Sequence, residues 1–436
     1  MGIDYFKHMR IFLALMAVLF TWNAHADVFD VRDYGAKGDG KTLDTTAIQK
    51  ALDACGNAGG GVVRFTVGTY LSQPITVRTR TTVDLEAGAT LQATTNQSDF
   101  MKTPGGWLKA RGSDFVPFIG GRNLTNVTFT GRGIIDGSGA VWWGEAEKAR
   151  QKVPGYTLPR PDLIVLQRCK NLRMENITLQ NSPKLHFGPE ECEDVVVSNL
   201  TIISPESAAN TDGVDPSDCR HVLITKCRID TGDDNISIKT GHKVPGREFA
   251  CEDIMVSDCI FLHGHGMSIG SQTSGGVHDV TVERCSFENT DNGIRIKSQR
   301  GKGGLVENIV FKDITMTNVD PAVTFTCYYM ANSARDPVQK PLPENDPAQA
   351  VTPETPVFRN IYVSNLTATS EGGAGIIMGL PESKISNVVF ENVKISAMSG
   401  MRIENAGGIE FTNSSIMVKE GRPFWSKNAD VKSFMN

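Results

Sequence analysis

The chain has 436 residues, with 44 Lys and Arg against 49 Asp and Glu, a net charge of −5 and 40% hydrophobic residues. This length allows a large core, in two ordinary domains or in one elongated domain. A slightly acidic chain has no basic field that would attract nucleic acid, and the hydrophobic content is ordinary for a soluble protein.

The N-terminus has the pattern of an export signal. Lys7 and Arg10 precede the apolar run IFLALMAVLF at 11–20, and AHA at 24–26 follows. A basic flank, a short apolar stretch and a small-x-small end define a secretory signal peptide, and the run is too short to span a bilayer comfortably. We expect residues 1–26 to be removed, and the mature protein to be extracellular or periplasmic with no membrane attachment.

The stretch GAKGDGKT at 35–42 satisfies the phosphate-loop pattern G-x-x-x-x-G-K-[ST], between a strand-like run and a helix-like run. Export argues against nucleotide binding, because there is little ATP outside the cell. No further alternation of strands and helices follows. We expect the glycines to shape the turn into a helix at about 45–55, whose apolar residues share one face and whose N-cap is Asp44.

One phrase recurs from Cys169 onward, as CKNLRMENITL, CEDVVVSNLTI, CRHVLITKCRI, CEDIMVSDCIF, VHDVTVERCSF and VENIVFKDITM. A period of 20 to 35 residues, built from short β-branched runs, indicates a stacked solenoid. Helical repeats are excluded because no repeat holds ten residues of helical periodicity. The predicted fold is all-β: a right-handed, single-stranded parallel β-helix with one coil per repeat, covered at its N-terminal end by the helix at 45–55.

Equivalent residues of stacked coils lie about 4.8 Å apart. Cys, Asn, Val and Ile are therefore expected to form interior stacks. Cys227, Cys259 and Cys285 hold one position in successive coils, which favours buried thiols over disulfides, although nine cysteines leave at least one without a partner in the chain. The sequons at Asn176 and Asn199 arise from the same repeat, and we interpret them first as ladder residues and second as glycan sites.

Three segments interrupt the repeats without resembling linkers. Such insertions usually rim a cleft. A single domain over 27–436 is therefore expected. The insertions are 98–115, 143–162 and 336–356.

A second segment follows each repeat phrase, and the four copies NTDGVDPS, GDDNISIK, GHGMSIGS and DNGIRIKS align by their aliphatic residues. The aligned columns are Val214, Ile236, Met267 and Ile294; Asp212, Asp234, His265 and Asn292; Asp215, Ser237, Ser268 and Arg295; and Ser217, Lys239, Gly270 and Lys297. The aliphatic column points inward by strand alternation, so the polar columns point outward. One outer wall thus carries carboxylates, a histidine, an arginine and lysines, with Asp233 beside Asp234.

Asp212, Asp233 and Asp234 repel one another, so at least one proton should be held with raised affinity. An acid–base catalyst can use a carboxyl with raised proton affinity, whereas a structural protein would avoid the repulsion among the three carboxylates. Taken singly, an Asp pair in a glycine-rich turn is ordinary turn chemistry or a Ca²⁺ site, and Arg-x-Lys is a solvated strand face. Their placement together in adjacent coils favours a catalytic site.

NTD at 210–212, GDD at 232–234, GHG at 264–266 and RIK at 295–297 resemble, in this order, the four signatures of the polygalacturonases of glycoside hydrolase family 28. The resemblance extends over most of the mature chain and includes NSPKLHF at 181–187. It implies a right-handed parallel β-helix, a secreted catalytic domain over most of the chain, and inverting hydrolysis of α-1,4-linked galacturonan. No cofactor or metal ion is expected.

The resemblance also implies roles for single residues. Asp233 would be the general acid, and Asp212 and Asp234 would hold and activate the attacking water. Inverting enzymes separate acid and base by roughly 6.5–9.5 Å, and coil stacking would place Asp212 and Asp234 together with Asp233 offset. His265 would hydrogen-bond within the cluster and help keep the acid protonated.

Substrate contacts are implied for four further residues. Arg295 and Lys297 would bind the galacturonate carboxylate, the arginine by a forked contact and the lysine as a point charge. Asn210 and Lys239 are expected to bind substrate as well. The expected partner is an acidic polysaccharide, and a monomer is expected. One departure is Asn235, where many family members have Cys, which leaves a disulfide missing and local stability in doubt.

Three alternatives remain open. A pectate lyase on the same fold would need a Ca²⁺ cage and a base that abstracts a proton, and the His and RIK motifs favour hydrolysis instead. A rhamnogalacturonan hydrolase would generally lack this His and Arg-Lys pattern. A non-catalytic binding or tailspike β-helix would have no use for the carboxylate cluster. The sequence leaves endo versus exo attack open.

Overall fold

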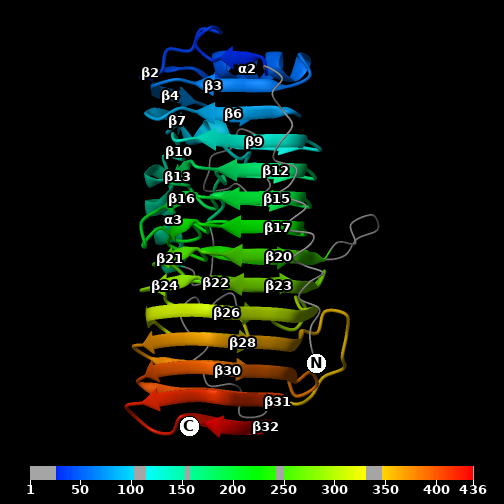
Figure 1. Cartoon of the computed structure of the whole chain (residues 1–436). Helices are drawn as coiled ribbons and strands as arrows, with labels where there is room; N and C mark the ends of the chain where they lie inside the picture. The colour runs from blue at the N-terminus through cyan, green and yellow to red at the C-terminus, as the bar shows by residue number, and fades with distance from the viewer. Residues whose placement is uncertain (1–25, 103–113, 153–157, 242–249, 330–345, 436) are drawn as a thin grey trace.

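The computed structural model describes residues 26–102, 114–152, 158–241, 250–329 and 346–435. The expected signal peptide therefore lies outside the described residues except for Ala26, and its cleavage stays a prediction. The described strands stack into a right-handed parallel β-helix with three faces, and the successive coils run from top to bottom of Figure 1. This confirms the predicted fold class.

The first face holds the recurring phrase. Its strands pair in parallel in the order β1 (Val28–Asp30), β3 (Gly61–Phe65), β6 (Thr81–Leu85), β9 (Thr125–Gly131), β12 (Lys170–Glu175), β15 (Glu193–Ser198), β17 (Arg220–Thr225), β20 (Cys251–Ser257), β23 (Val277–Glu283), β26 (Leu305–Val319), β28 (Val357–Ser370), β30 (Ile385–Ala397), β31 (Ser399–Val418) and β32 (Phe424–Met435). Its inward residues form the expected stacks: Leu172 pairs with Val195 and Met174 with Val197, and all four are buried.

The second face consists of shorter strands. They are β2 (Asp39–Leu43), β4 (Gly68–Ser72), β7 (Ala89–Ala93), β10 (Ile134–Asp136), β13 (Thr178–Gln180), β16 (Thr201–Ile203), β18 (Arg228–Asp230), β21 (Ile260–Leu262) and β24 (Ser286–Glu288). The last of them, β24, pairs with the second half of β26.

The third face carries the aligned motifs. Its strands are β5 (Ile75–Thr76), β8 (Ile119–Arg122), β11 (Ile164–Gln167), β14 (Phe187–Glu190), β19 (Ile236–Thr240), β22 (Met267–Thr273), β25 (Ile294–Lys297), β27 (Val323–Thr326) and β29 (Gly373–Met378), which pairs with the start of β31. Single bridges from Val214 to Phe187 and Ile236 join β14 to β19.

All nine cysteines lie in the described part of the chain, and each is a free, buried thiol. The backbone N–H of Cys169 donates to Cys192 Sγ, and that of Cys192 donates to Cys219 Sγ, both at 3.4 Å. The expected stacks of buried thiols are therefore confirmed, in an arrangement that fills the interior without crosslinks.

The prediction that asparagines stack in the interior is wrong for most of the asparagines that recur from coil to coil. Asn199 donates to Asn176 at 2.8 Å, and both side chains are exposed at a corner of the coil. Both residues have positive φ, 53° and 63°. Asparagine tolerates this left-handed conformation, so it recurs where each coil turns between faces. A ladder of amides on the outside then satisfies these side chains from coil to coil.

The N-terminal end is covered by α2 (Thr45–Asn57), as expected, with Ile48 and Leu52 among its buried residues. Asp44 precedes the helix, but its carboxylate does not cap it. The carboxylate instead accepts the N–H groups of Lys37 and Gly38, at 2.6 and 2.9 Å. It therefore folds the GAKGDGKT turn back onto the start of the helix.

A second carboxylate inside that turn completes its hydrogen bonds. Asp39 accepts the N–H groups of Thr42 and Lys41, and these bonds lower its pKa to about 2. N–H groups that a phosphate loop would direct at a phosphate are thus used by the chain's own carboxylates.

A second helix, α3 (Ala140–Lys152), was not expected. Its residues are mostly good helix formers, but two tryptophans and Gly144 obscured the pattern. Trp142 is fully buried, with its ring centroid 5.8 Å from that of Phe100, near η1 (Gln97–Phe100), and 5.9 Å from that of Phe115. Two of the insertions therefore pack on each other, although 103–113 and 153–157 lie outside the described residues. Across the described ranges, no helix is long and apolar enough to cross a membrane.

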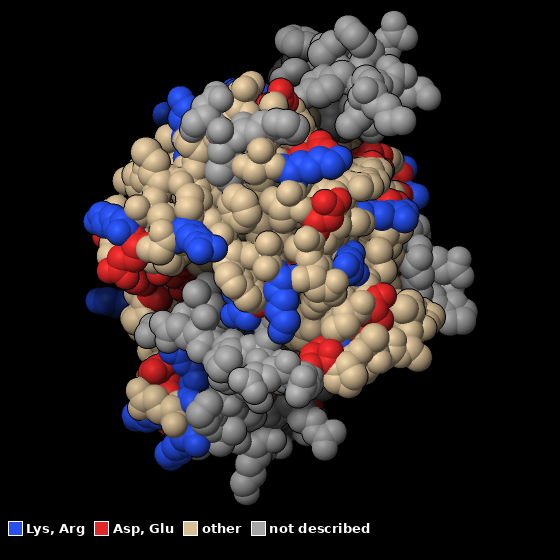
Figure 2. Space-filling model, turned by 90° about the horizontal axis from the view of Figure 1, so that it is seen from below, with Lys and Arg blue, Asp and Glu red and all other residues tan. Residues whose placement is uncertain are grey.

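Charge is mixed on the face seen along the β-helix axis from below. Lys and Arg alternate there with Asp and Glu, without a large area of one sign (Figure 2). On this face, positive charge is therefore not gathered into one patch.

Candidate active site

The register of the third face is the one that the aligned motifs predicted. Ile236 pairs with Met267 and Met267 with Ile294, so the aliphatic column is a continuous inward stack. The polar columns follow, with Ser268 opposite Arg295. The outward wall proposed from sequence is therefore present.

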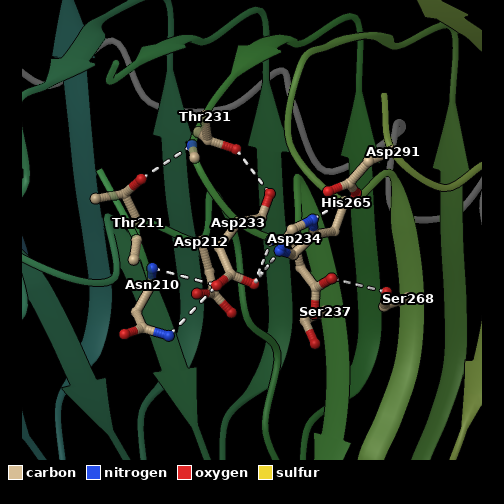
Figure 3. A network of polar contacts seen from close by, with 12 residues as sticks. Asn210, Thr211, Asp212, Thr231, Asp233, Asp234, Ser237, His265, Ser268 and Asp291 are labelled. Atoms are coloured by element: carbon tan, nitrogen blue, oxygen red, sulfur yellow. Dashed lines mark hydrogen bonds and ion pairs between the residues drawn. The ribbon is translucent and has the colours of Figure 1, made fainter. Parts of the chain in front are cut away.

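Three carboxylates meet on this wall. Asp212 lies in the segment between β16 and β17, and Asp233 and Asp234 lie in the turn before β19. One oxygen of each lies within 4.8 Å of the others. In Figure 3 the carboxylates of Asp212 and Asp233 lie next to each other, and that of Asp234 is directed toward Ser268. These closest oxygens lie nearer to one another than roughly 6.5–9.5 Å, the separation between the carboxyl groups of inverting enzymes.

Asp234 is the most strongly neutralised carboxylate. Its Oδ1 accepts Ser268 Oγ at 2.9 Å and pairs with Arg295, and its Oδ2 pairs with Lys297 Nζ at 2.7 Å. Burial would raise the pKa of Asp234, but the two cations outweigh burial and hold it well below its usual range. Arg295 and Lys297, expected to contact substrate, are thus 8% and 4% exposed and already share a carboxylate.

Asp233 is held from the opposite side. Its Oδ2 accepts the backbone and side-chain N–H groups of Asn210 at 3.2 and 3.3 Å, and its Oδ1 accepts the N–H of Asp234 at 2.9 Å. Behind Asn210, Arg160 is almost fully buried and reaches the Asn210 Oδ1 at 3.3 Å. Burial, together with the charge of Asp212, raises the pKa of Asp233. A proton on Asp233 suits a general acid.

His265 bridges two carboxylates. Its Nδ1 lies 2.5 Å from Asp291 Oδ1, and its Nε2 lies 3.7 Å from Asp233 Oδ1. Burial would lower its pKa, but these two negative charges raise it. The resulting imidazolium lowers the pKa of Asp233, so the expectation that His265 keeps the acid protonated is wrong in sign. Burial and the charge of Asp212, and not His265, raise the pKa of Asp233.

The glycines beside His265 are needed for close packing of the coils. Gly264 and Gly266 have φ of +73° and +66°. A Cβ on Gly264 would lie 2.4 Å from the Asp233 carbonyl oxygen, and one on Gly266 would lie 2.2 Å from that of Asn292. Only glycine combines this backbone with such an approach, which explains the pattern GHG.

Lys239 is already held by two carboxylates of the protein. Its Nζ pairs with Asp212 Oδ2 at 3.1 Å and with Asp215 Oδ2 at 2.5 Å. Of the predicted site residues, the structure thus brings together the three carboxylates, His265, Arg295, Lys297, Asn210 and Lys239.

Some functional neighbours escaped the sequence analysis. Asp291 precedes Asn292 in an aligned motif, so the alignment could have found it. Arg160 and Tyr329 gave no such signal, because both lie outside the aligned segments. The Tyr329 ring lies 5.0 Å from Lys297 Nζ, within range of a cation–π contact.

Asn235 replaces the missing disulfide with hydrogen bonds. Its fully buried amide donates to the Ile229 and Leu262 carbonyl oxygens at 3.1 and 3.4 Å, and to Thr231 Oγ1 at 3.3 Å. Its Oδ1 accepts the Gly266 N–H at 3.0 Å. One amide therefore ties together the turns that carry Asp233 and His265, which answers the doubt about local stability.

The three carboxylates also have the spacing of a cation site. Two of them already hold ammonium or guanidinium groups, from Lys239 on Asp212 and from Arg295 and Lys297 on Asp234. A Ca²⁺ ion would have to displace these cations, so the arrangement suits acid–base chemistry better than the cage of a lyase.

Comparisons with known proteins agree with this chemistry. The model of the family Glycosyl hydrolases family 28 matches residues 59–416. An endo-polygalacturonase of Pectobacterium carotovorum subsp. carotovorum is 31% identical over 382 residues, which cover 85% of this chain and 88% of that protein. A probable polygalacturonase of Vitis vinifera is 29% identical over 402 residues, which cover 88% and 77%.

Solved structures share the fold. A polygalacturonase from Erwinia carotovora ssp. carotovora is similar with a TM-score of 0.73 and 28% identity, over 94% of this chain and 98% of that one. A family 28 exopolygalacturonase of Yersinia enterocolitica has a TM-score of 0.76 and 23% identity, over 94% and 79%. At that identity the second likeness shows the fold alone.

Proposed function

Because this chain belongs to glycosyl hydrolase family 28 and is a polygalacturonase by its relatives, we propose that it hydrolyses the α-1,4-galacturonosidic bonds of polygalacturonate with inversion. The observation that carries the proposal is the division of protonation among the three clustered carboxylates. Asp233 holds a raised pKa, whereas the pKa values of Asp212 and Asp234 are lowered. Environments that move the pKa values of neighbouring carboxylates in opposite directions assign one of them as the acid and another as the base.

In the proposed reaction, Asp233 donates its proton to the glycosidic oxygen as the bond to the anomeric carbon breaks. A water held by Asp212 and Asp234 attacks that carbon from the opposite side and loses a proton to a carboxylate. At rest, the closest oxygens are nearer than an inverting geometry requires. Substrate and water must therefore enter between Asp233 and the other two carboxylates.

The charges near Asp234 support an acidic substrate. Arg295 and Lys297 together carry two positive charges against the single charge of Asp234, so one positive charge is left for a galacturonate carboxylate. Arg295 has five N–H donors. Its Nε–H donates to Ser268 Oγ, and one N–H of Nη2 donates to Asp234 Oδ1. The protein as a whole is acidic, so this local excess is what would attract the polymer.

The test is digestion of polygalacturonate by the purified protein, with proton NMR of the first products. Hydrolysis releases reducing ends without ultraviolet absorbance, and inversion gives the β-anomer first. Unsaturated products that disappear with EDTA would mean a lyase, and initial α-anomer would mean retention. A ladder of oligomers over time would mean endo attack, and monomer or dimer alone would mean exo attack.

Export and oligomeric state belong to the same proposal. We expect a secreted monomer that begins after Ala26, so N-terminal sequencing of exported protein should begin at Asp27 and its light-scattering mass should be that of one chain. A precursor that keeps residues 1–26 in the medium would contradict the signal peptide.

A further inference from the structure

Lys239 lies between two carboxylates of the preceding coil. Its Nζ is 3.1 Å from Asp212 Oδ2 and 2.5 Å from Asp215 Oδ2. The register requires this placement, because Ser217 bridges to Lys239 across the third face. Asp215 is 5% exposed, and its Oδ1 is buried with no hydrogen-bond partner in the described part of the chain.

The charges here do not balance unless a proton is retained. Asp212 and Asp215 share one ammonium group, and two ionised carboxylates in contact with a single cation are costly. Burial, followed by the charge of Asp212, raises the pKa of Asp215 well above its usual range. Burial would also raise the pKa of Asp212, but Lys239 outweighs it and lowers the pKa.

Other charges face this pair as well. Those that act on Asp212 and Lys239, besides each other, are Asp215, Asp233, Asp234, Lys184, Arg160 and the buried His186, whose Nδ1 lies 3.0 Å from the Asp212 carbonyl oxygen. Lys184 is already paired with Asp162 at 3.1 Å, and Arg160 donates to backbone carbonyl oxygens at 2.7 to 3.2 Å. Lys239 is therefore the cation in direct contact with Asp212 within the described residues.

The contacts also distinguish Asp212 from Asp234. Both oxygens of Asp234 hold cationic donors, Arg295 on Oδ1 and Lys297 on Oδ2. A carboxylate stabilised by two cations has little affinity for a further proton and is a weak base. Asp212 has one cation, Lys239, and a neighbouring carboxyl that can carry a proton. Asp212 is thus the better acceptor of the proton that the attacking water loses.

We propose that Lys239 and Asp215 are positioning residues for Asp212: Lys239 keeps Asp212 ionised, and Asp215 stays a neutral acid whose O–H donates to Asp212. This inference rests on the proposed function and replaces the expected substrate contact of Lys239. When water attacks, a lone pair on its oxygen forms the new C–O bond while the bond from the anomeric carbon to the glycosidic oxygen breaks. The water's proton moves to Asp212, and the O–H electron pair stays on the water oxygen. Asp215 keeps its own proton throughout.

The test compares pH profiles of kcat/KM for the wild type and the variants Lys239→Met, Lys239→Arg and Asp215→Asn. The acidic limb reports the base of the free enzyme. Loss of the ammonium should move this limb upward by about 1 to 3 pH units, the usual effect of an opposite charge at such distance. Lys239→Arg should restore the wild-type limb. Asp215→Asn mimics a neutral acid and should move the limb by less than about 1 unit.

A matched control is Lys170→Met, which removes a lysine paired with Glu193 on the first face, and it should leave the limb in place. A second measurement, carbon NMR titration of the Asp212 carboxyl, assigned by its loss in Asp212→Asn, needs no substrate. It should show the same upward shift in Lys239→Met.

Two results would overturn the inference. If Lys239→Met raised KM alone and left both the limb and the Asp212 titration unchanged, Lys239 would be a substrate contact. If Asp215→Asn moved the limb downward by about 1 pH unit or more, Asp215 would be ionised in the wild type, because loss of a negative charge lowers the pKa of Asp212. The wild-type protein could fail to cleave polygalacturonate while Lys239→Met still shows the upward shift of the Asp212 titration. That result would refute the proposed function and leave the effect of Lys239 on Asp212 in place.

Discussion

The amide of Asn235 is the most specific stability test in the molecule. Asn235→Ala removes a fully buried group that donates to Ile229 O at 3.1 Å and accepts from Gly266 N at 3.0 Å, besides two longer bonds. Leaving a buried donor or acceptor unpaired costs about 1–3 kcal/mol. The two short bonds together predict a loss of about 2–6 kcal/mol in the free energy of unfolding.

The assay is urea unfolding followed by circular dichroism, with hydrogen exchange of the Gly266 amide as the local readout. The exposed Asn57, at the end of α2, provides the control: Asn57→Ala should stay within about 0.5 kcal/mol of the wild type. We also expect Asn235→Ala to lower kcat, because the loosened turns carry Asp233 and His265. An unfolding free energy within 1 kcal/mol of the wild type, with unchanged exchange at Gly266, would refute the reasoning.

Four more predictions concern the site and the packing that supports it. Asp233→Asn should lower kcat by about 10²- to 10⁴-fold, as loss of a general acid does, with a smaller change in KM; near wild-type turnover would remove Asp233 from that role. Activity should be greatest at acidic to mildly acidic pH and fall as pH rises through the raised pKa of Asp233, so a rate that climbs steadily into alkaline pH would contradict it. The depressed pKa of Asp234 contributes stability that is present above about pH 4 and lost as pH falls through the folded value, which acid unfolding should show and Asp234→Asn should abolish. Trp142→Ala should cost about 3–5 kcal/mol, since the ring is fully buried between Phe100 and Phe115; a melting temperature equal to the wild type's would mean that the insertions do not depend on it.

The pattern of stacked coils was readable in the sequence because the fold is periodic. In a parallel β-helix, residues aligned between repeats become neighbours about 4.8 Å apart, so an alignment of four short segments already predicts a tertiary contact. The Ile236, Met267 and Ile294 column and the meeting of Asp212 with Asp234 followed from this rule alone. The helix at the N-terminal end followed from its apolar face in the same way.

The choice of ion-pair partners was decided only by the tertiary structure. Alignment places Lys239 and Lys297 in one column, yet the first pairs with Asp212 and Asp215 and the second with Asp234. Long side chains can reach carboxylates one or two coils away, so the alignment alone does not say which carboxylate each lysine contacts. The sequence also gave no sign of Arg160, which lies outside the repeats and supports Asn210.

The sequence by itself thus determined the solenoid, its register and the residues gathered on one wall, because these depend on a repeat that is local along the chain. The tertiary structure decided which carboxylate keeps a proton, why Asp44 holds the GAKGDGKT turn instead of capping its helix, and how Asn235 replaces a disulfide. These depend on burial and on the direction of single side chains. Both are set by everything that packs around a residue, and neither repeats from coil to coil.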